Sequence, residues 1–174
     1  MMRRLIALLV AALAVAASPA AAATFRWAYD SDIASLDPYT RNETLQLSLL
    51  GNIYEPLVRR GRTLQLEPAL AAGWRQIAPL VWRFDLRPGV RFQDGTPFGA
   101  DDVVFSYRRA IAAGSKVALA LAAIRDVRAV DARTVDITTA MPDPTLPEEI
   151  VRWDIMSAAW CRTHGTEQIA AADD

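Results

Sequence analysis

Cys161 and His164 have the greatest potential for chemistry in this sequence, and each is the only residue of its type. Side chains three positions apart can touch on a helix, so this pair could act as a thiolate nucleophile with its base, or supply two metal ligands. A closed zinc site needs a complete tetrahedral set of ligands, and no other cysteine or histidine is present. No orienting third group or oxyanion hole is indicated. The sequence therefore predicts no metal site, and an exported hydrolase that uses this pair stays a rival hypothesis.

The acidic pair and the glycine turns are explained better by local structure than by catalysis. Asp101 and Asp102 are adjacent, so on a helix their side chains point in different directions and cannot easily share one substrate. In a first helical turn, both carboxylates would favour the positive end of the helix dipole. Asp94-Gly95 is typical of a turn, because the remaining ligands of a calcium loop are missing. Since no glycine-rich phosphate loop or Gly-x-Ser-x-Gly elbow occurs either, we predict no catalytic residues, no cofactor and no enzymatic activity.

Residues 1–23 have the pattern of a signal peptide for export. Two arginines form a positive start, Leu5–Ala17 is an apolar run too short to span a bilayer comfortably, and small residues follow. Cleavage near Ala22 or Ala23 would release a mature chain into the periplasm, and an uncleaved membrane anchor is the alternative.

Composition narrows the classes of partner. The formal net charge is −1 and the sequence has no basic cluster, which argues against nucleic acid. With one cysteine, no intrachain disulfide can form. The five tryptophans could line a ligand cleft, but at strand and helix spacing we expect them mainly in the core.

The hydrophobic periodicity predicts short strands and helices in alternation. Strands are predicted over 25–30, 57–60, 63–66, 81–87 and 90–92, and as a hairpin over 124–130 and 134–139. Helices are predicted over 44–54, over 101–113 with Gly99 as N-cap, and over 147–162, with a short turn-and-helix piece over 68–74. Asp37-Pro38 predicts a turn.

Several short motifs follow one another in a specific order. They are Phe25-Arg26-Trp27-Ala28 with Ser35-Leu36-Asp37-Pro38, then Ile53-Tyr54-Glu55-Pro56-Leu57, then Glu67-Pro68-Ala69-Leu70-Ala71 with Gly73-Trp74, and finally Phe84 to Tyr107. In this order they resemble the family 5 solute-binding proteins, the extracytoplasmic receptors of ABC importers for peptides, nickel and similar solutes. Gly99 departs from the pattern, because members usually carry a threonine or serine cap there.

The resemblance implies a mixed α/β fold, namely the N-terminal portion of the two-lobed fold of type II periplasmic binding proteins, with the second lobe absent. It implies that 24–45 begin lobe I, that 46–150 form an inserted sheet-and-helix subdomain, and that 151–174 are an incomplete return to lobe I. Members are several times longer, which implies a truncated gene, a split gene or a fragment. With one wall of the cleft absent, closure on a ligand would be lost and sheet edges exposed.

The resemblance also implies a function, that of a non-enzymatic component of an ABC importer, which captures a solute and delivers it to permease subunits in the membrane. Peptide is the default solute, with nickel and others open. The expected ligand-binding residues are Asp32, Ile33, Ala34 and Ser35, through their backbone groups, and a solvated loop is the alternative. A separately encoded remaining lobe is left open as a partner. The alternative function is a remnant or interaction domain that binds no solute.

Overall fold

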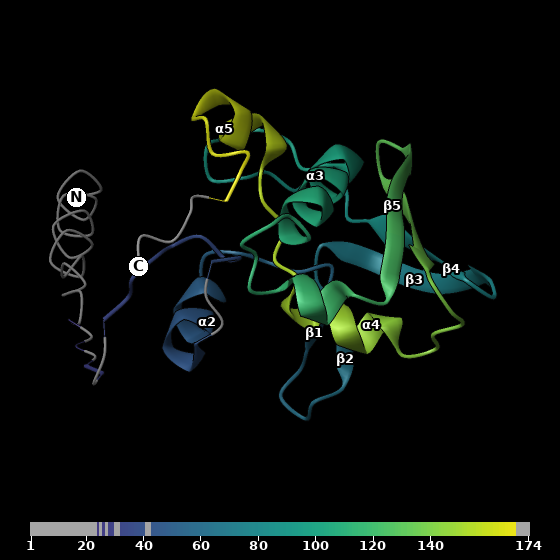
Figure 1. The fold of residues 1–174 in the computed structure, drawn as a ribbon, viewed down its shortest axis with the longest axis horizontal. Helices are drawn as coiled ribbons and strands as arrows, with labels where there is room; N and C mark the ends of the chain where they lie inside the picture. The colour runs from purple at the N-terminus through teal and green to yellow at the C-terminus, as the bar shows by residue number, and fades with distance from the viewer. Residues whose placement is uncertain (1–23, 25, 27, 30–31, 41–42, 170–174) are drawn as a thin grey trace, which may run out of the picture. The chain divides into compact units, whose positions relative to one another are not determined.

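The computed structural model describes residues 24, 26, 28–29, 32–40 and 43–169 (Figure 1). The chain divides into two units, Met1–Asp30 and Ser31–Asp174. In the first unit the described residues belong to no helix or strand. The predicted signal peptide, its cleavage site and half of the strand predicted over 25–30 lie outside the described residues. In the described part of the chain, no helix is long and apolar enough to cross a membrane.

The second unit is built on a four-stranded antiparallel sheet. Its spatial order is β3 (Ala71–Ala78), β4 (Val81–Leu86), β6 (Thr134–Thr139) and β5 (Ile124–Asp131). This confirms the strand predicted over 81–87, the hairpin predicted over 124–139 and the mixed α/β class.

Alternation along β4 gives the sheet one apolar and one charged face. Phe84 and Leu86 are buried in the core. Arg83 points to the other side and donates to both carboxylate oxygens of Asp136 on β6, at 2.7 and 2.9 Å. Because side chains alternate across a strand, the sequence itself assigns one face to the core and the other to paired charges near solvent.

Helix α3 (Ala100–Ala110) packs against β5 and β6 and supplies the second layer of the core (Figure 1). Gly99 is its N-cap, as predicted, and Asp102 accepts a hydrogen bond from the Gly99 N–H at 2.9 Å. A Cβ at Gly99 would lie 3.1 Å from the carbonyl oxygen of Ala132. Glycine therefore fits here because the β5–β6 turn approaches the helix start closely, which accounts for the missing threonine or serine cap.

Two of the other predicted elements are shorter in the structure. The helix predicted over 44–54 is α2 (Thr44–Leu50), which is followed by hydrogen-bonded turns up to Tyr54. The strand predicted over 90–92 is reduced to one isolated bridge, between Arg91 and Pro97.

The segment predicted as turn-and-helix over 68–74 is instead extended, so that prediction was wrong. β1 (Val58–Arg60) pairs with β2 (Leu66–Pro68), which starts three residues after the strand predicted from Thr63. β3 then follows almost at once and pairs with β4, so that Trp74 stacks on Phe84 with ring centroids 6.5 Å apart. Pairing and aromatic packing override the helix propensity of the alanines.

The helix predicted over 147–162 is broken into pieces, so that prediction was also wrong. It consists of α4 (Leu146–Glu149), the 3₁₀ turn η2 (Ile150–Arg152), an extended stretch over 153–157 and α5 (Ala158–Thr163). Ser157 caps α5 by accepting from the Trp160 N–H at 3.1 Å. The remaining short element is the 3₁₀ turn η1 (Ala118–Leu121).

Arg109, near the end of α3, ties together distant parts of the second unit. Its buried guanidinium donates to both carboxylate oxygens of Asp37, which confirms a turn at Asp37-Pro38, and its Nε donates to the Thr166 carbonyl at 3.1 Å. The guanidinium also lies over the ring of Tyr39, 5.5 Å from its centroid. One cation thus holds the first and last described segments of the unit against α3.

Candidate functional site

The residues predicted to bind ligand, Asp32, Ile33, Ala34 and Ser35, form an irregular extended stretch ahead of the Asp37 turn. Asp32 and Ala34 are exposed, and the Ser35 hydroxyl accepts from the Asp37 N–H at 3.0 Å. None of the four lines either of the two pockets described below. Their role in ligand binding stays a prediction.

Two segments of the chain lie side by side at the point where one leads into the strands and the other leads out of them. Segment 53–57 runs antiparallel to segment 153–157, with a bridge between Pro56 and Asp154 and a 3.1 Å hydrogen bond from the Ile155 N–H to the Glu55 carbonyl. Helix α3 holds the second segment, because Ser106 accepts from the Met156 N–H at 2.9 Å. These contacts fix the two segments against each other and against α3, and we call this pair of segments the crossing.

Asp102, in the first turn of α3, also holds the chain that follows the crossing. Its second carboxylate oxygen accepts from the Ala158 N–H at 2.9 Å, while Asp101 beside it is exposed. Burial raises the pKa of Asp102, and the hydrogen bonds from Ala158 and Gly99 partly offset this. The two acidic residues therefore have different roles, since Asp102 also joins α3 to the start of α5.

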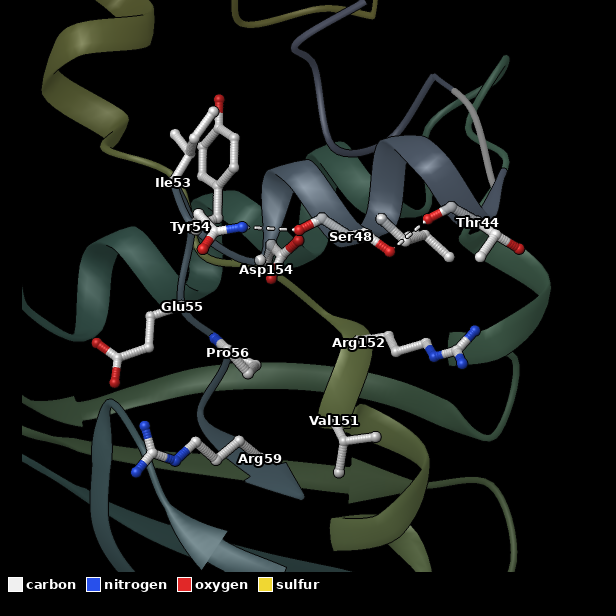
Figure 2. Close-up of a pocket in the computed structure, with 13 residues that line it drawn as sticks. Thr44, Ser48, Ile53, Tyr54, Glu55, Pro56, Arg59, Val151, Arg152 and Asp154 are labelled. Carbon is white, nitrogen blue, oxygen red and sulfur yellow. Dashed lines mark hydrogen bonds between the residues drawn. The ribbon is translucent and has the colours of Figure 1, made fainter. Parts of the chain in front are cut away.

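One pocket, of about 670 Å³, opens on one side of the crossing (Figure 2). Helix α2 forms its roof, and segments 53–56 and 151–154, with Arg59 of β1, form the remaining walls. The charged residues that line it are Glu55, Arg59, Arg152 and Asp154. A concave site of this size with a few polar groups is suited to a small solute.

Two of the four charged groups in the pocket are neutralised within the chain. Glu55 accepts from Arg87 at 3.0 Å, and Arg59 lies 3.4 Å from Glu67. Asp154 and Arg152 have no such partner among the described residues. Burial raises the pKa of Asp154 to about 6, because the charged carboxylate is desolvated without compensation.

A second pocket, of about 370 Å³, lies on the other side of Tyr54 and is mainly apolar. Its aromatic lining comes from Tyr54, Phe92, Phe98 and Trp160. Trp160 is 42% exposed, whereas Trp153 is 1% exposed and belongs to the core. The expectation that tryptophans are mainly core residues therefore fits Trp153 better than Trp160.

Cys161 and His164 do not form a joint site. Cys161 is fully buried, and burial raises the pKa of its thiol. His164 is exposed, stacks on Trp160 with ring centroids 4.2 Å apart, and its Nδ1 lies 2.8 Å from the Trp160 carbonyl oxygen. Within the described residues no cluster of three or more histidine, cysteine, aspartate or glutamate side chains could hold a metal ion.

Arg152 and Asp154 were missed by the sequence reasoning because 147–162 was predicted as one helix. The pattern that could have found them is charge, aromatic, charge over Arg152, Trp153 and Asp154. In the structure Arg152 ends η2 and Asp154 lies in the extended stretch that follows, and both line the first pocket while Trp153 between them is buried.

This chain is similar in sequence and in fold to known proteins of one family. Residues 65–163, more than half of the chain, match the model of the bacterial extracellular solute-binding proteins, family 5 Middle. The solute-binding protein MoaA from A. tumefaciens R10, solved with mannopinic acid, is 35% identical with a TM-score of 0.70 over 77% of this chain and 29% of that one. The murein tripeptide binding protein MppA of Escherichia coli is 26% identical with a TM-score of 0.70 over 75% of this chain and 30% of that one.

A curated protein of another kind also resembles this chain. The HTH-type transcriptional regulator SgrR of Escherichia coli O6:K15:H31 is 40% identical over 83 residues, which are 48% of this chain and 14% of that protein. The chain thus spans 14% of the length of this curated relative and under a third of the two solved structures. The matched model and a fold shared at this identity lead to one conclusion, that this chain belongs to the family 5 bacterial extracellular solute-binding proteins.

Proposed function

We propose that this chain supplies the N-terminal part of the periplasmic solute-binding component of an ABC importer of the peptide/nickel class. In this proposal residues 1–23 direct export, and 24–45, 46–150 and 151–174 are the start of lobe I, an inserted subdomain and the return to lobe I. Solute is captured in a cleft, the lobes close, and the loaded receptor docks on permease subunits. The chain itself carries out no catalysis.

The observation that carries the proposal is the family match over 65–163 together with the 35% identity to MoaA. The crossing of segments 53–57 and 153–157 adds physical support. It places two pockets around Tyr54, and Asp32–Ser35 precede Leu36, whose carbonyl accepts from the Tyr54 hydroxyl at 3.2 Å. We therefore keep Asp32–Ser35 as proposed ligand contacts at the edge of this region.

Thermal unfolding of the purified chain, with and without candidate solutes, tests the proposal. The panel contains an oligopeptide pool, a dipeptide, a nickel–histidine chelate and mannopinic acid. A solute present at about a hundred times its Kd should stabilise the chain by about 2.7 kcal/mol and raise its transition temperature.

A pair of variants locates the effect. Ala34→Trp should reduce the shift if Asp32–Ser35 contact solute, whereas Ala113→Trp, at an exposed alanine after α3, should leave it unchanged. A cooperative transition that no solute moves would instead favour the alternative, a remnant or interaction domain that binds no solute.

A further inference from the structure

Helix α2, the roof of the larger pocket, has few ties to the rest of the second unit. It is seven residues long, and a helix this short is only marginally stable on its own. Among the described residues it packs extensively against no other helix or strand. It is held by the buried side chains of Leu45 and Leu50 and by a 3.2 Å hydrogen bond from Gln46 Nε2 to the Asp37 carbonyl oxygen. Helix α2 can therefore lift while the sheet and α3 stay folded.

The closed position of α2 leaves two polar groups without a hydrogen bond from the described part of the chain. Gln46 is 2% exposed, and its Oε1 atom has no hydrogen-bond partner among the described residues. Beneath the middle of α2, the Asp154 carboxylate accepts no hydrogen bond from the described chain either. Figure 2 shows it close to Ser48, whose hydroxyl donates instead to the Thr44 carbonyl oxygen at 2.8 Å. Lifting α2 would bring water to both groups and so remove a cost in free energy.

Only one of these two costs depends on pH, because the amide of Gln46 does not ionise. With α2 closed, burial raises the pKa of Asp154 from 3.8 to about 6. With α2 lifted, water solvates the carboxylate and its pKa returns towards 3.8. The closed form therefore binds the proton of Asp154 more tightly than the open form does. Opening becomes easier as the pH rises between these two values, and the effect is complete above them.

The neighbouring charged and titratable groups do not change this sign. Those that lie against Asp154 or line the same pocket are Tyr39, Tyr54, Glu55, Arg59 and Arg152. Helix α2 lines the pocket with Thr44, Leu47 and Ser48, which carry no charge. Glu55 is paired with Arg87, and Arg59 with Glu67. Burial raises the pKa of both tyrosines, so they stay neutral near pH 7. Desolvation is the only cause of the raised pKa of Asp154, so Arg152 does not offset it.

We propose that α2 is a lid on the larger pocket and that the ionisation of Asp154 controls it. The lid is closed while Asp154 is protonated and lifts more often once Asp154 is ionised. Access to the pocket is therefore greater at neutral pH than in acid. The inference goes beyond the proposed function, because it needs neither a solute nor a second lobe.

Hydrogen–deuterium exchange of the purified chain, followed by mass spectrometry of peptides that cover 44–50, tests this assignment. Amide groups of α2 exchange when the helix opens, and each measured rate is divided by that of the unfolded peptide at the same pH. The frequency of opening should be about tenfold higher near pH 7.5 than near pH 5, because the open form loses the Asp154 proton more readily. Peptides from β4 and β6 should exchange far more slowly, because they open only when the whole chain unfolds.

Asp154→Asn removes the ionisable group and is the decisive variant. It should lower the opening of α2 near pH 7.5 about a hundredfold and abolish its dependence on pH. Glu55→Gln, which removes a paired carboxylate from the same pocket, should change neither. Opening that does not change with pH, or that keeps its pH dependence in Asp154→Asn, would overturn the proposal. Equal protection of α2 and β4 would overturn it too, because α2 would then open only with the whole chain.

Discussion

The Asp154→Asn substitution probes the larger pocket without any solute. Burial raises the pKa of Asp154 from 3.8 to about 6, so the folded chain binds this proton more tightly than the unfolded chain does. Between these two values the folded state carries more protons, and stability falls as the pH rises through that window and stays low above it. At roughly 1.4 kcal/mol per unit, the rise from 3.8 to about 6 corresponds to about 3 kcal/mol.

Asparagine has nearly the shape of the protonated side chain but cannot ionise. The variant should therefore be more stable than the natural chain by up to about 3 kcal/mol near pH 8, with the difference shrinking to about zero below pH 4. Urea unfolding, followed by tryptophan fluorescence at a series of pH values, measures the difference.

Glu55→Gln is the control for this experiment. Glu55 lines the same pocket but is partly exposed and paired with Arg87, so its substitution should change stability by less than about 1 kcal/mol at any of these pH values. An Asp154→Asn effect that does not depend on pH, or a variant less stable than the natural chain near pH 8, would refute the reasoning.

Three further predictions concern groups that hold the fold. Arg109→Met should lower the free energy of unfolding by about 3 kcal/mol or more, because it leaves Asp37 unpaired, and a loss below 1 kcal/mol in urea unfolding would contradict this. Asp102→Ala should cost about 2 kcal/mol by orphaning two backbone N–H groups, whereas Asp101→Ala should change stability by less than about 0.5 kcal/mol, and equal costs would argue against the different roles given to them. Cys161 should react with iodoacetamide, followed by mass spectrometry, only after urea unfolding, because burial covers the thiol and raises its pKa; rapid alkylation of the native chain would revive the hydrolase hypothesis.

Elements with strong periodicity could be predicted from the sequence. β4, the β5–β6 hairpin and α3 have the spacing of their apolar residues set by which face they bury, and each lies within a few residues of its prediction. In these elements local preference and tertiary packing favour the same structure.

The secondary-structure predictions that were wrong concern segments in which the local helix propensity and the tertiary packing favour different structures. Ala71 and its neighbours favour a helix alone, yet in the fold they form β3, because β4 offers an antiparallel partner and Phe84 a ring for Trp74. Pairing of this kind depends on residues distant in the sequence, so a local pattern does not contain it.

The candidate site was missed for the same reason. On the predicted helix, Arg152 and Asp154 would point in nearly opposite directions, and no joint pocket would follow. In the structure η2 ends at Arg152, the bridge between Pro56 and Asp154 holds the next residues extended, and Arg152 and Asp154 line one pocket. Asp32–Ser35 could be proposed only from the family resemblance, because short loop residues have no chemistry of their own that distinguishes them.

The position of Arg109 also bears on the order in which the chain can fold. Its contacts with Asp37 and Thr166 span 72 and 57 residues of sequence, and the Tyr39 hydroxyl bonds to the Asp154 carbonyl across 115. Pairing of β4 with β6 already joins Val81 to Thr138, so the contacts with Asp37 and between Tyr39 and Asp154 are the longer closures, and we expect them after the sheet and α3 have formed. When the chain is synthesised from its N-terminus, the segment around Asp37 would therefore stay unattached until α3 has also been synthesised and can supply Arg109. During that interval chaperones and proteases would have access to the segment. The rate at which α3 follows it would then affect the yield of folded chain, together with the final stability.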